Sequence, residues 1–103
     1  MPKRKHKFAA KKTIVDGIVF PSKKEARRYS ELKLLERAGK IKHLRRQVPY
    51  KIVIATRYVA DFVYVDCFDG AEIVEDVKGY KTPEYLRKKK LMAAQHGITI
   101  REC

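Results

Sequence analysis

Two runs of β-branched and aromatic residues, joined by a short acidic segment, most restrict the fold of this chain. The runs cover Tyr58–Val65 and Ala71–Val77, and the segment between them ends in Asp69-Gly70. Asp-Gly between two such runs is a strong signal for a β-hairpin. We therefore expect two antiparallel strands, against which the other elements pack.

The same hairpin places acidic side chains on faces where they need compensation. Side chains alternate between the faces of a strand, so Asp61 shares a face with Val59 and Val63, while Asp76 shares a face with Lys78. A carboxylate among apolar side chains is unfavourable unless a cation or hydrogen bonds compensate it. Asp61, Asp76 and Lys78 are therefore candidates for a functional site.

The distribution of charge points in the same direction. The chain has 25 Lys and Arg against 12 Asp and Glu, a formal net charge of +13, yet no Lys or Arg lies between Tyr58 and Val77. A basic protein with one acidic cluster fits a metal-dependent enzyme that acts on a polyphosphate, because lysines bind the substrate and carboxylates bind the divalent ion. The competing interpretation is a solvated acidic hairpin, which we favour for the other acids of this segment, namely Asp66, Asp69, Glu72 and Glu75.

The length predicts one α/β domain over residues 13–103, preceded by a flexible basic arm over residues 1–12. The first expected elements are a hairpin over Thr13–Phe20, a helix over Lys23–Ala38, a basic edge or loop over Lys40–Gln47, and a strand over Val48–Ala55 with a turn at Thr56-Arg57. A helix from Pro83 to about Gln95 and a strand over Ile98–Arg101 follow the acidic hairpin. The inward-facing helix residues should be Tyr29, Leu32, Leu35, Leu86, Met92 and Ala93.

Glu25 has two interpretations. Ser22 and Glu25 have the spacing of a capping box, in which the glutamate satisfies a backbone amide at the start of the helix. Glu25 also begins the helical series that continues with Tyr29 and Leu32, so its carboxylate can lie near Asp61 and Asp76. The pattern alone leaves both roles open.

Basic residues outside the hairpin are candidates for contact with nucleic-acid phosphates. The alternative for each is a solvated, solubilising surface. The clearest cluster is Arg87 to Lys90, which spreads around much of the second helix. The full set is Lys11, Lys12, Lys23, Arg45, Arg46, Lys81, Arg87, Lys88, Lys89 and Lys90.

The sequence also predicts an intracellular protein. No apolar run approaches the roughly 20 residues of a membrane span, and the N-terminus lacks the apolar core of a signal peptide. Cys67 and Cys103 are too few for a disulfide framework, which fits a reducing compartment. No small-molecule cofactor is expected.

Asp61 on one strand, followed by Asp76-Val77-Lys78 on the next and preceded by a helix with Glu25, resembles the signature of the PD-(D/E)XK nuclease superfamily. This resemblance implies a restriction-endonuclease-like αβββαβ core, with a mixed sheet flanked by two helices. It implies that Asp61, Asp76 and the carbonyl of Val77 bind Mg²⁺ or Mn²⁺ and that Lys78 is catalytic. It also favours a catalytic and metal-binding role for Glu25, since small members carry an acid on the first helix.

A longer resemblance covers about Lys11 to Ile100. The segments SKKEARRYSELKLLERAGKI, VADFVY and VEDVKG, together with Gln47-Val48-Pro49, are similar to small phage and prophage proteins that were first catalogued as a domain of unknown function. That family is grouped with the same fold and described as Holliday-junction-resolvase-like. Two departures are Ala60 where the motif has proline, and Asp76 as the second acid, which Glu75 would replace only if the strand register shifted by one residue.

The resemblance therefore implies a metal-dependent DNA endonuclease that cuts branched DNA as a homodimer. Two alternatives remain open at this point. One is a nuclease or nickase without selectivity for junctions, and the other is a non-catalytic basic module that binds nucleic acid.

Overall fold

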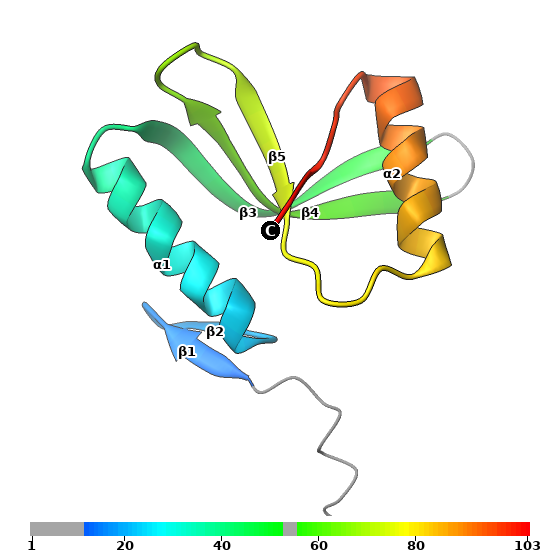
Figure 1. The fold of residues 1–103 in the computed structure, drawn as a ribbon. Coiled ribbons are helices and arrows are strands. Elements are labelled where there is room, and N and C mark those ends of the chain that lie inside the picture. The colour runs from blue at the N-terminus through cyan, green and yellow to red at the C-terminus, as the bar shows by residue number, and fades with distance from the viewer. Residues whose placement is uncertain (1–11, 53–55) are drawn as a thin grey trace, which may run out of the picture.

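The computed structural model describes residues 12–52 and 56–103 of the chain (Figure 1). The elements in order are β1 (Thr13–Val15), β2 (Ile18–Phe20), α1 (Lys23–Arg37), β3 (Ile41–Ile52), β4 (Thr56–Asp66), β5 (Glu72–Asp76), α2 (Pro83–His96) and β6 (Arg101–Glu102). The predicted α/β class, with a hairpin followed by an α-β-β-β-α-β order, is confirmed. Most of the basic arm, including Lys11, lies outside the described residues. Among the described residues, no helix is both long and apolar enough to span a membrane.

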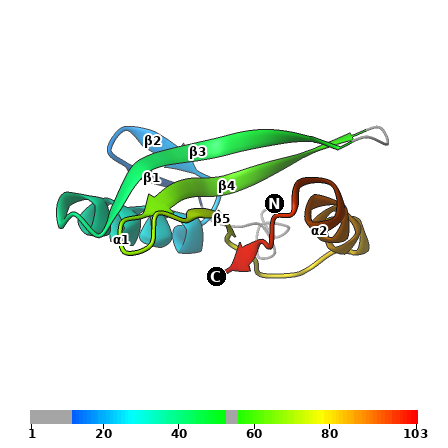
Figure 2. The same cartoon turned by 90° about the horizontal axis from the view of Figure 1, so that it is seen from above.

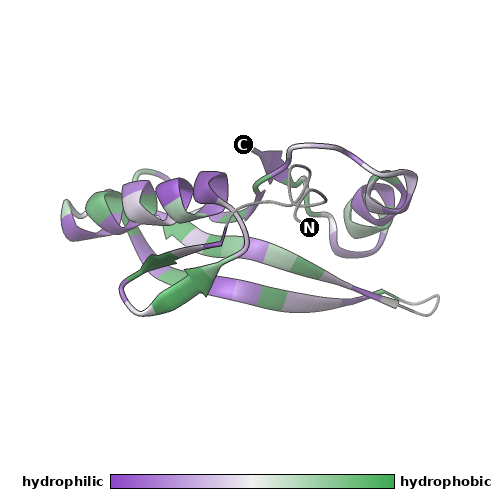
Figure 3. Cartoon of the chain, turned by 90° about the horizontal axis from the view of Figure 1, so that it is seen from below, coloured by the Kyte–Doolittle hydropathy of each residue, from purple (hydrophilic) through white to green (hydrophobic). Residues whose placement is uncertain are grey.

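The N-terminal hairpin forms a separate two-stranded sheet. Asp16 and Gly17 both have positive φ angles, 53° and 75°, which is the backbone that a tight two-residue hairpin turn requires. Val15 and Ile18 pack against the core beneath α1. The other face of the hairpin is apolar and exposed, and Figure 3 shows hydrophobic residues over much of β1 and β2.

The main sheet has the strand order β3-β4-β5-β6. The β3–β4 and β4–β5 pairs are antiparallel, whereas β5 and β6 are parallel because α2 carries the chain back between them. Strands β3 and β4 form a long twisted ribbon, with α1 beside one end and α2 beside the other (Figure 2). The predicted mixed sheet with two accompanying helices is thus present.

Both faces of β4 are covered at its centre. Phe62 and Tyr64 pack in the apolar cluster of α1, whereas Val63 between them packs in the cluster of α2. Ala60 nevertheless belongs to the α2 cluster, although it has the same parity along the strand as Phe62. The strand must therefore twist between Ala60 and Phe62, and Asp61 lies at this changeover.

The structure corrects two predictions about β3. The strand begins at Ile41, so the segment Lys40–Gln47, predicted as a basic edge or loop, is mostly strand and belongs to the edge strand of the sheet. The edge alternative is confirmed and the loop alternative is wrong. A β-bulge between Lys42 and Arg45, with His43 at a φ of 58°, interrupts the alternation that would have revealed a strand. The predicted turn at Thr56-Arg57 is wrong, because Thr56 pairs with Ile52 in the β3–β4 ladder. Residues 53–55, predicted as the end of a strand, lie outside the described residues.

The helix termini follow the predicted signals. Ser22 Oγ accepts a hydrogen bond from the Glu25 amide at 3.1 Å, and Thr82 Oγ1 accepts one from the Tyr85 amide at 3.1 Å. Gly97, with a φ of 65°, ends α2 in the left-handed conformation.

Some packing predictions for the helices are wrong. Met92 is buried as expected, but Leu86 is 43% exposed and Ala93 is also exposed, because α2 turns Tyr85 toward the sheet instead. Tyr29 and Leu32 are buried in α1, whereas Leu35 is 37% exposed near the end of that helix. The final strand covers only Arg101–Glu102, so most of the predicted Ile98–Arg101 strand is not strand.

Candidate active site

Three carboxylates from three different elements meet where β4 changes face. Glu25 comes from the first turn of α1, Asp61 from the middle of β4 and Asp76 from the end of β5. The side chain of Gln47 joins the first two, since its Nε2 lies 3.4 Å from Glu25 Oε2 and 3.3 Å from Asp61 Oδ1. Asp61 Oδ2 also accepts a hydrogen bond from the Val77 amide at 2.9 Å. The loop after β5 is thereby tied to β4.

Asp76 is the most enclosed of the three acids, with 2% of its surface exposed. The Tyr58 hydroxyl donates a hydrogen bond to Asp76 Oδ2 at 2.7 Å, and Lys78 Nζ lies 3.5 Å from the same oxygen. Burial raises the pKa of Asp76 above its ordinary value, and a hydrogen-bonded contact with Asp61 raises it further, whereas Tyr58 and Lys78 lower it. Burial also raises the pKa of Tyr58, so this hydroxyl remains a donor.

Glu25 is buried behind Gln47. Burial raises the pKa of Glu25 to about 7, the negative charge of Asp61 adds to this shift, and Arg46 and Lys78 oppose it. The Ser22 hydroxyl oxygen accepts a hydrogen bond from the backbone amide of Glu25 and so caps α1 without using the Glu25 carboxylate. Ser22 is therefore the N-cap, but the carboxylate of Glu25 lies beside Gln47 rather than completing a capping box, so the site interpretation describes this side chain better.

Lys78 is held at the site through its backbone and its side chain. Its amide donates to the carbonyl of Cys103 at 3.2 Å, and its own carbonyl accepts from Lys24 Nζ at 2.8 Å. Its ammonium lies 4.2 Å from the centre of the Tyr85 ring, a favourable cation–π contact. The positive charge of Lys78 is therefore positioned next to Asp76.

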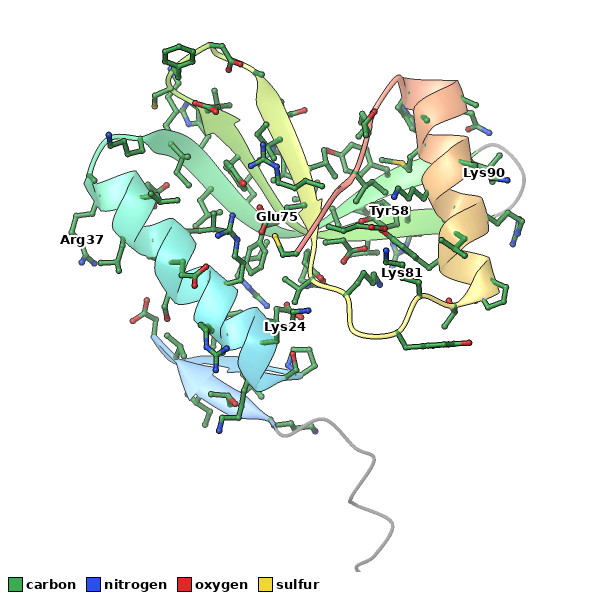
Figure 4. The ribbon with its side chains drawn as sticks, viewed as in Figure 1. Lys24, Arg37, Tyr58, Glu75, Lys81 and Lys90 are labelled. Carbon is green, nitrogen blue, oxygen red and sulfur yellow. The ribbon has the colours of Figure 1, made fainter. Side chains whose placement is uncertain are left out.

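These groups open into a cleft of about 500 Å³. In Figure 4, Tyr58 and Lys81 lie between β4 and α2, on the side of the sheet away from α1. The residues that line the cleft are Arg57, Tyr58, Val59, Asp61, Asp76, Lys78, Thr82, Glu84, Tyr85 and Lys88. The predicted Asp61, Asp76 and Lys78 are thus brought together at one accessible place, with Glu25 behind them.

Glu75 lies on the opposite face of β5 and is not part of the cleft. It is fully buried, and Arg28 binds it with two nitrogens, one of them Nη2 at 3.0 Å from Oε1. Burial alone would raise the pKa of Glu75, but hydrogen bonds from Arg28, Cys103 and Tyr64 hold that pKa below its ordinary value. The prediction of a solvated Glu75 is wrong, and the structure places Asp76 rather than Glu75 beside Asp61.

The other acids of the hairpin have structural roles near its turn. Asp66 and Asp69 accept hydrogen bonds from the amides of Phe68 and Ala71, at 2.8 and 2.9 Å. Glu72 is exposed and forms an ion pair with Arg45 at 2.9 Å.

The predicted phosphate-binding residues differ in how available their charges are. Lys12, Lys23, Arg87 and Lys90 are exposed, and Lys88 lines the cleft while pairing with Glu84 at 3.5 Å. Lys81 and Lys89 both pair with Glu102, at 2.9 and 3.0 Å. Arg46 is partly covered, because its guanidinium lies 4.6 Å from the centre of the Phe20 ring and 3.9 Å from Glu25.

The donor atoms at the site suit a hard divalent cation. Asp61 and Asp76 offer carboxylate oxygens, the ligands that Mg²⁺ and Mn²⁺ prefer, and the buried Asp76 is compensated only in part by Lys78. Within residues 12–52 and 56–103, no three His, Cys, Asp or Glu side chains are grouped as a ready metal-binding cluster. Asp61 and Asp76 therefore fit such an ion as a pair that backbone oxygen or water would complete.

Several site residues have only a weak signal in the sequence, or none. The alternation of aromatic residues along β4 predicts Tyr58 to be a core residue, and it is indeed buried, but its hydroxyl is at the site. Tyr85 carries no signal beyond its place in the first turn of α2. The sequence indicates only weakly that Gln47 belongs to the site. Its backbone has a positive φ of 52°, and the residue pattern does not predict this conformation.

Comparison with known proteins identifies a family for the chain. A search of curated proteins and a search of solved structures each return no match. The sequence profile described as "Protein of unknown function (DUF1064)" matches residues 5–101, which is nearly the whole length. The chain therefore belongs to the DUF1064 family.

Proposed function

We propose that this chain is a metal-dependent endonuclease that hydrolyses phosphodiester bonds in DNA. The observation that carries the proposal is that Asp61, Asp76 and Lys78 line one open cleft of a strongly basic protein, with the buried Glu25 close to Asp61 behind them. The element order and the spacing of these residues resemble the PD-(D/E)XK nucleases, which supports the same interpretation. The proposal therefore joins geometry, charge and resemblance.

In this proposal Asp61, Asp76 and the carbonyl of Val77 hold Mg²⁺ or Mn²⁺. When bound there, such an ion would supply Lewis-acid stabilisation of charge on the scissile phosphate and would lower the pKa of a coordinated water. The hydrogen bonds from Tyr58 and from the Val77 amide orient the two carboxylates toward the cleft. Orientation of ligating carboxylates by such neighbours is a common requirement for metal affinity.

The remaining residues act on charge and protons. The Lys78 ammonium, which lies 3.5 Å from Asp76, stabilises negative charge that develops on the phosphate and positions the attacking water. The carboxyl of Glu25, with a pKa of about 7, exchanges a proton with water near neutral pH. The side-chain amide of Gln47 donates to both Glu25 and Asp61 and so fixes the positions of these two carboxylates relative to each other.

We assign branched DNA as the substrate, because the chain resembles junction-resolving proteins. Symmetric cutting of two strands at a junction needs two active sites, so a homodimer is part of the proposal. The resemblance to phage and prophage proteins supports a reaction inside a host cell.

The decisive experiment compares cleavage of a labelled four-way junction with cleavage of a matched linear duplex. Wild type is expected to nick the junction with Mg²⁺ or Mn²⁺, to leave a 5′-phosphate and to be inactive in EDTA. Asp76→Asn should abolish cutting. Glu72→Gln is the matched control, because it removes one negative charge from the same strand at an exposed position away from the cleft, and it should cut normally.

Each outcome has a distinct meaning. Equal cutting of junction and duplex would retain the nuclease and reject the junction selectivity. DNA binding without cutting under every metal condition would reject the nuclease and support the non-catalytic binding module, in which the basic residues alone act.

A further inference from the structure

Tyr80 differs from every other tyrosine in the described part of the chain. Its side chain is 80% exposed, whereas Tyr29, Tyr58, Tyr64 and Tyr85 are buried, and Tyr50 is half-buried against a neighbouring ring. Within the described residues, Tyr80 makes no hydrogen bond or ring contact with another side chain. A large aromatic ring exposed in this way is available to a partner.

The loop that carries Tyr80 is fixed at both ends. Lys78 is held through its amide and its carbonyl, by Cys103 and by Lys24. On the other side, Lys81 Nζ pairs with Glu102 at 2.9 Å and Thr82 caps α2. The exposed ring is therefore carried by a short, anchored segment, so its placement costs a partner little conformational entropy.

This loop borders the candidate active site. Lys78 and Thr82, two residues before and two residues after Tyr80, both line the cleft. Figure 4 shows the loop between β5 and α2 passing Lys24 and Lys81, so lysines lie on both sides of it. Lys81 pairs with Glu102, whereas Lys24 donates to the Lys78 carbonyl and forms no ion pair within the described residues, so its charge is not neutralised by an acid. An exposed aromatic ring beside such a cation is the combination that binds single-stranded nucleic acid, since the charge attracts phosphates and the ring stacks on a base.

We propose that Tyr80 stacks on an unpaired base of DNA bound at the cleft and thereby selects DNA that contains unpaired bases over continuous duplex. The inference rests on the proposed DNA-binding function and deepens it by naming the feature of the substrate that is recognised. In a continuous duplex both faces of each base are covered by neighbouring bases. An unpaired base with a free face is present at a fork, a gap or a single-stranded end, so this contact discriminates by DNA structure rather than by sequence.

The test measures binding in EDTA, where the proposed nuclease cuts nothing, with a forked DNA and a fully paired duplex of the same sequence. Tyr80→Ala should weaken binding of the fork about tenfold, as expected for the loss of one base–aromatic stack, and leave duplex binding unchanged. Tyr80→Phe should bind like wild type because it keeps the ring. A fork with 2-aminopurine as the first unpaired base should lose fluorescence on binding wild type but not Tyr80→Ala.

Phe68→Ala is the matched control. Phe68 is 95% exposed on the turn between β4 and β5, where it lines a separate cavity with Arg28 and Tyr64, away from the cleft. Its removal should change neither affinity, so a similar loss in both variants would overturn the inference. Unchanged fork binding by Tyr80→Ala, an equal loss on duplex, or a loss in Tyr80→Phe would also overturn it. Because the assay needs no cleavage, it gives its answer even if the metal-dependent nuclease proposal fails.

Discussion

At the scale of single residues, the protonation state of Asp76 depends strongly on its buried surroundings. An acid whose pKa is raised by folding binds its proton more tightly in the folded chain than in the unfolded chain. The free energy of unfolding therefore falls as pH rises from the ordinary aspartate pKa of about 4 through the raised folded value. Above that window the metal-free protein carries a buried charge that is compensated only in part by Tyr58 and Lys78.

Asp76→Asn should consequently stabilise the metal-free protein at high pH. In EDTA at pH 8, we expect its Tm to exceed that of wild type by roughly 5 °C or more, since 1 kcal/mol shifts Tm by about 4–8 °C in a domain of this size. At pH 4 the two proteins should melt within about 2 °C of each other. Thermal unfolding followed by circular dichroism measures both values. A lower Tm for Asp76→Asn at pH 8 would contradict the proposed destabilisation by the buried charge.

Mg²⁺ provides a second arm of the same measurement. A cation that binds only the folded site stabilises the protein by mass action, so Mg²⁺ in place of EDTA should raise the Tm of wild type at pH 8. Asp76→Asn should show little of this increase.

The sequence predicts the charged residues of the site better than it predicts their neutral neighbours. Asp61, Asp76 and Lys78 are found by strand alternation, because a carboxylate on an apolar face conflicts with its surroundings. The ring of Tyr58 fits a buried position on an apolar strand, so its place in the sequence gives no sign of a site role. Its hydroxyl nevertheless donates to Asp76, which lies 18 positions later in the sequence. The role of Arg28 is likewise invisible, since Glu75 becomes its partner only after α1 packs on β5.

At the scale of elements, the pair Arg28–Glu75 fastens α1 to β5. Glu75 is fully buried, so without its partner its charge would be left desolvated. Figure 4 shows Glu75 between the strand and the helix. Glu25 lies one helical turn before Arg28, so the same contact helps to fix where the carboxylate of Glu25 stands relative to Asp76.

Arg28→Ala should therefore destabilise the fold by about 3 kcal/mol, the cost of breaking a buried pair from one side. Urea unfolding measures this difference. Arg27→Ala is the control, because Arg27 is an exposed neighbour on the same helix, and its removal should change stability by no more than about 0.5 kcal/mol. Equal stability of the two variants would show that the pair does not fasten the helix.

The elements themselves are predictable wherever local chemistry sets them. Ser22, Thr82 and Gly97 mark helix ends by their own side chains or backbone, so these boundaries are readable in the sequence. The start of β3 is not predictable in this way, because a bulge near His43 breaks the alternation and the basic residues there resemble a loop. Pairing with β4 decides the structure of this segment, and that pairing is a tertiary event.

At the scale of the whole molecule, the net charge of +13 should govern DNA affinity. Arg87 and Lys90 are exposed on α2, and neither is held in an ion pair within the described residues. Lys81 and Lys89 already pair with Glu102. Arg87 and Lys90 are therefore the better candidates for direct phosphate contact.

The double substitution Arg87→Ala/Lys90→Ala should weaken binding to forked and duplex DNA alike. The slope of log affinity against log salt should become shallower by about 1.8, because each phosphate that a protein neutralises contributes about 0.9 to this slope. Lys81→Ala/Lys89→Ala should have the smaller effect, because these two charges are already shared with Glu102. Fluorescence anisotropy over a salt series measures both slopes, and the opposite ranking would refute this assignment.

Asp61 lies where β4 passes from the apolar cluster of one helix to that of the other. The buried apolar residues form two small cores, one with α1 and one with α2, and β4 crosses the boundary between them. Charged side chains at this boundary do not replace apolar side chains inside either core. Glu25 comes from the side of α1, and Lys78 packs on Tyr85 of α2. The cluster of Glu25, Asp61, Asp76 and Lys78 therefore forms only when both cores are packed against β4.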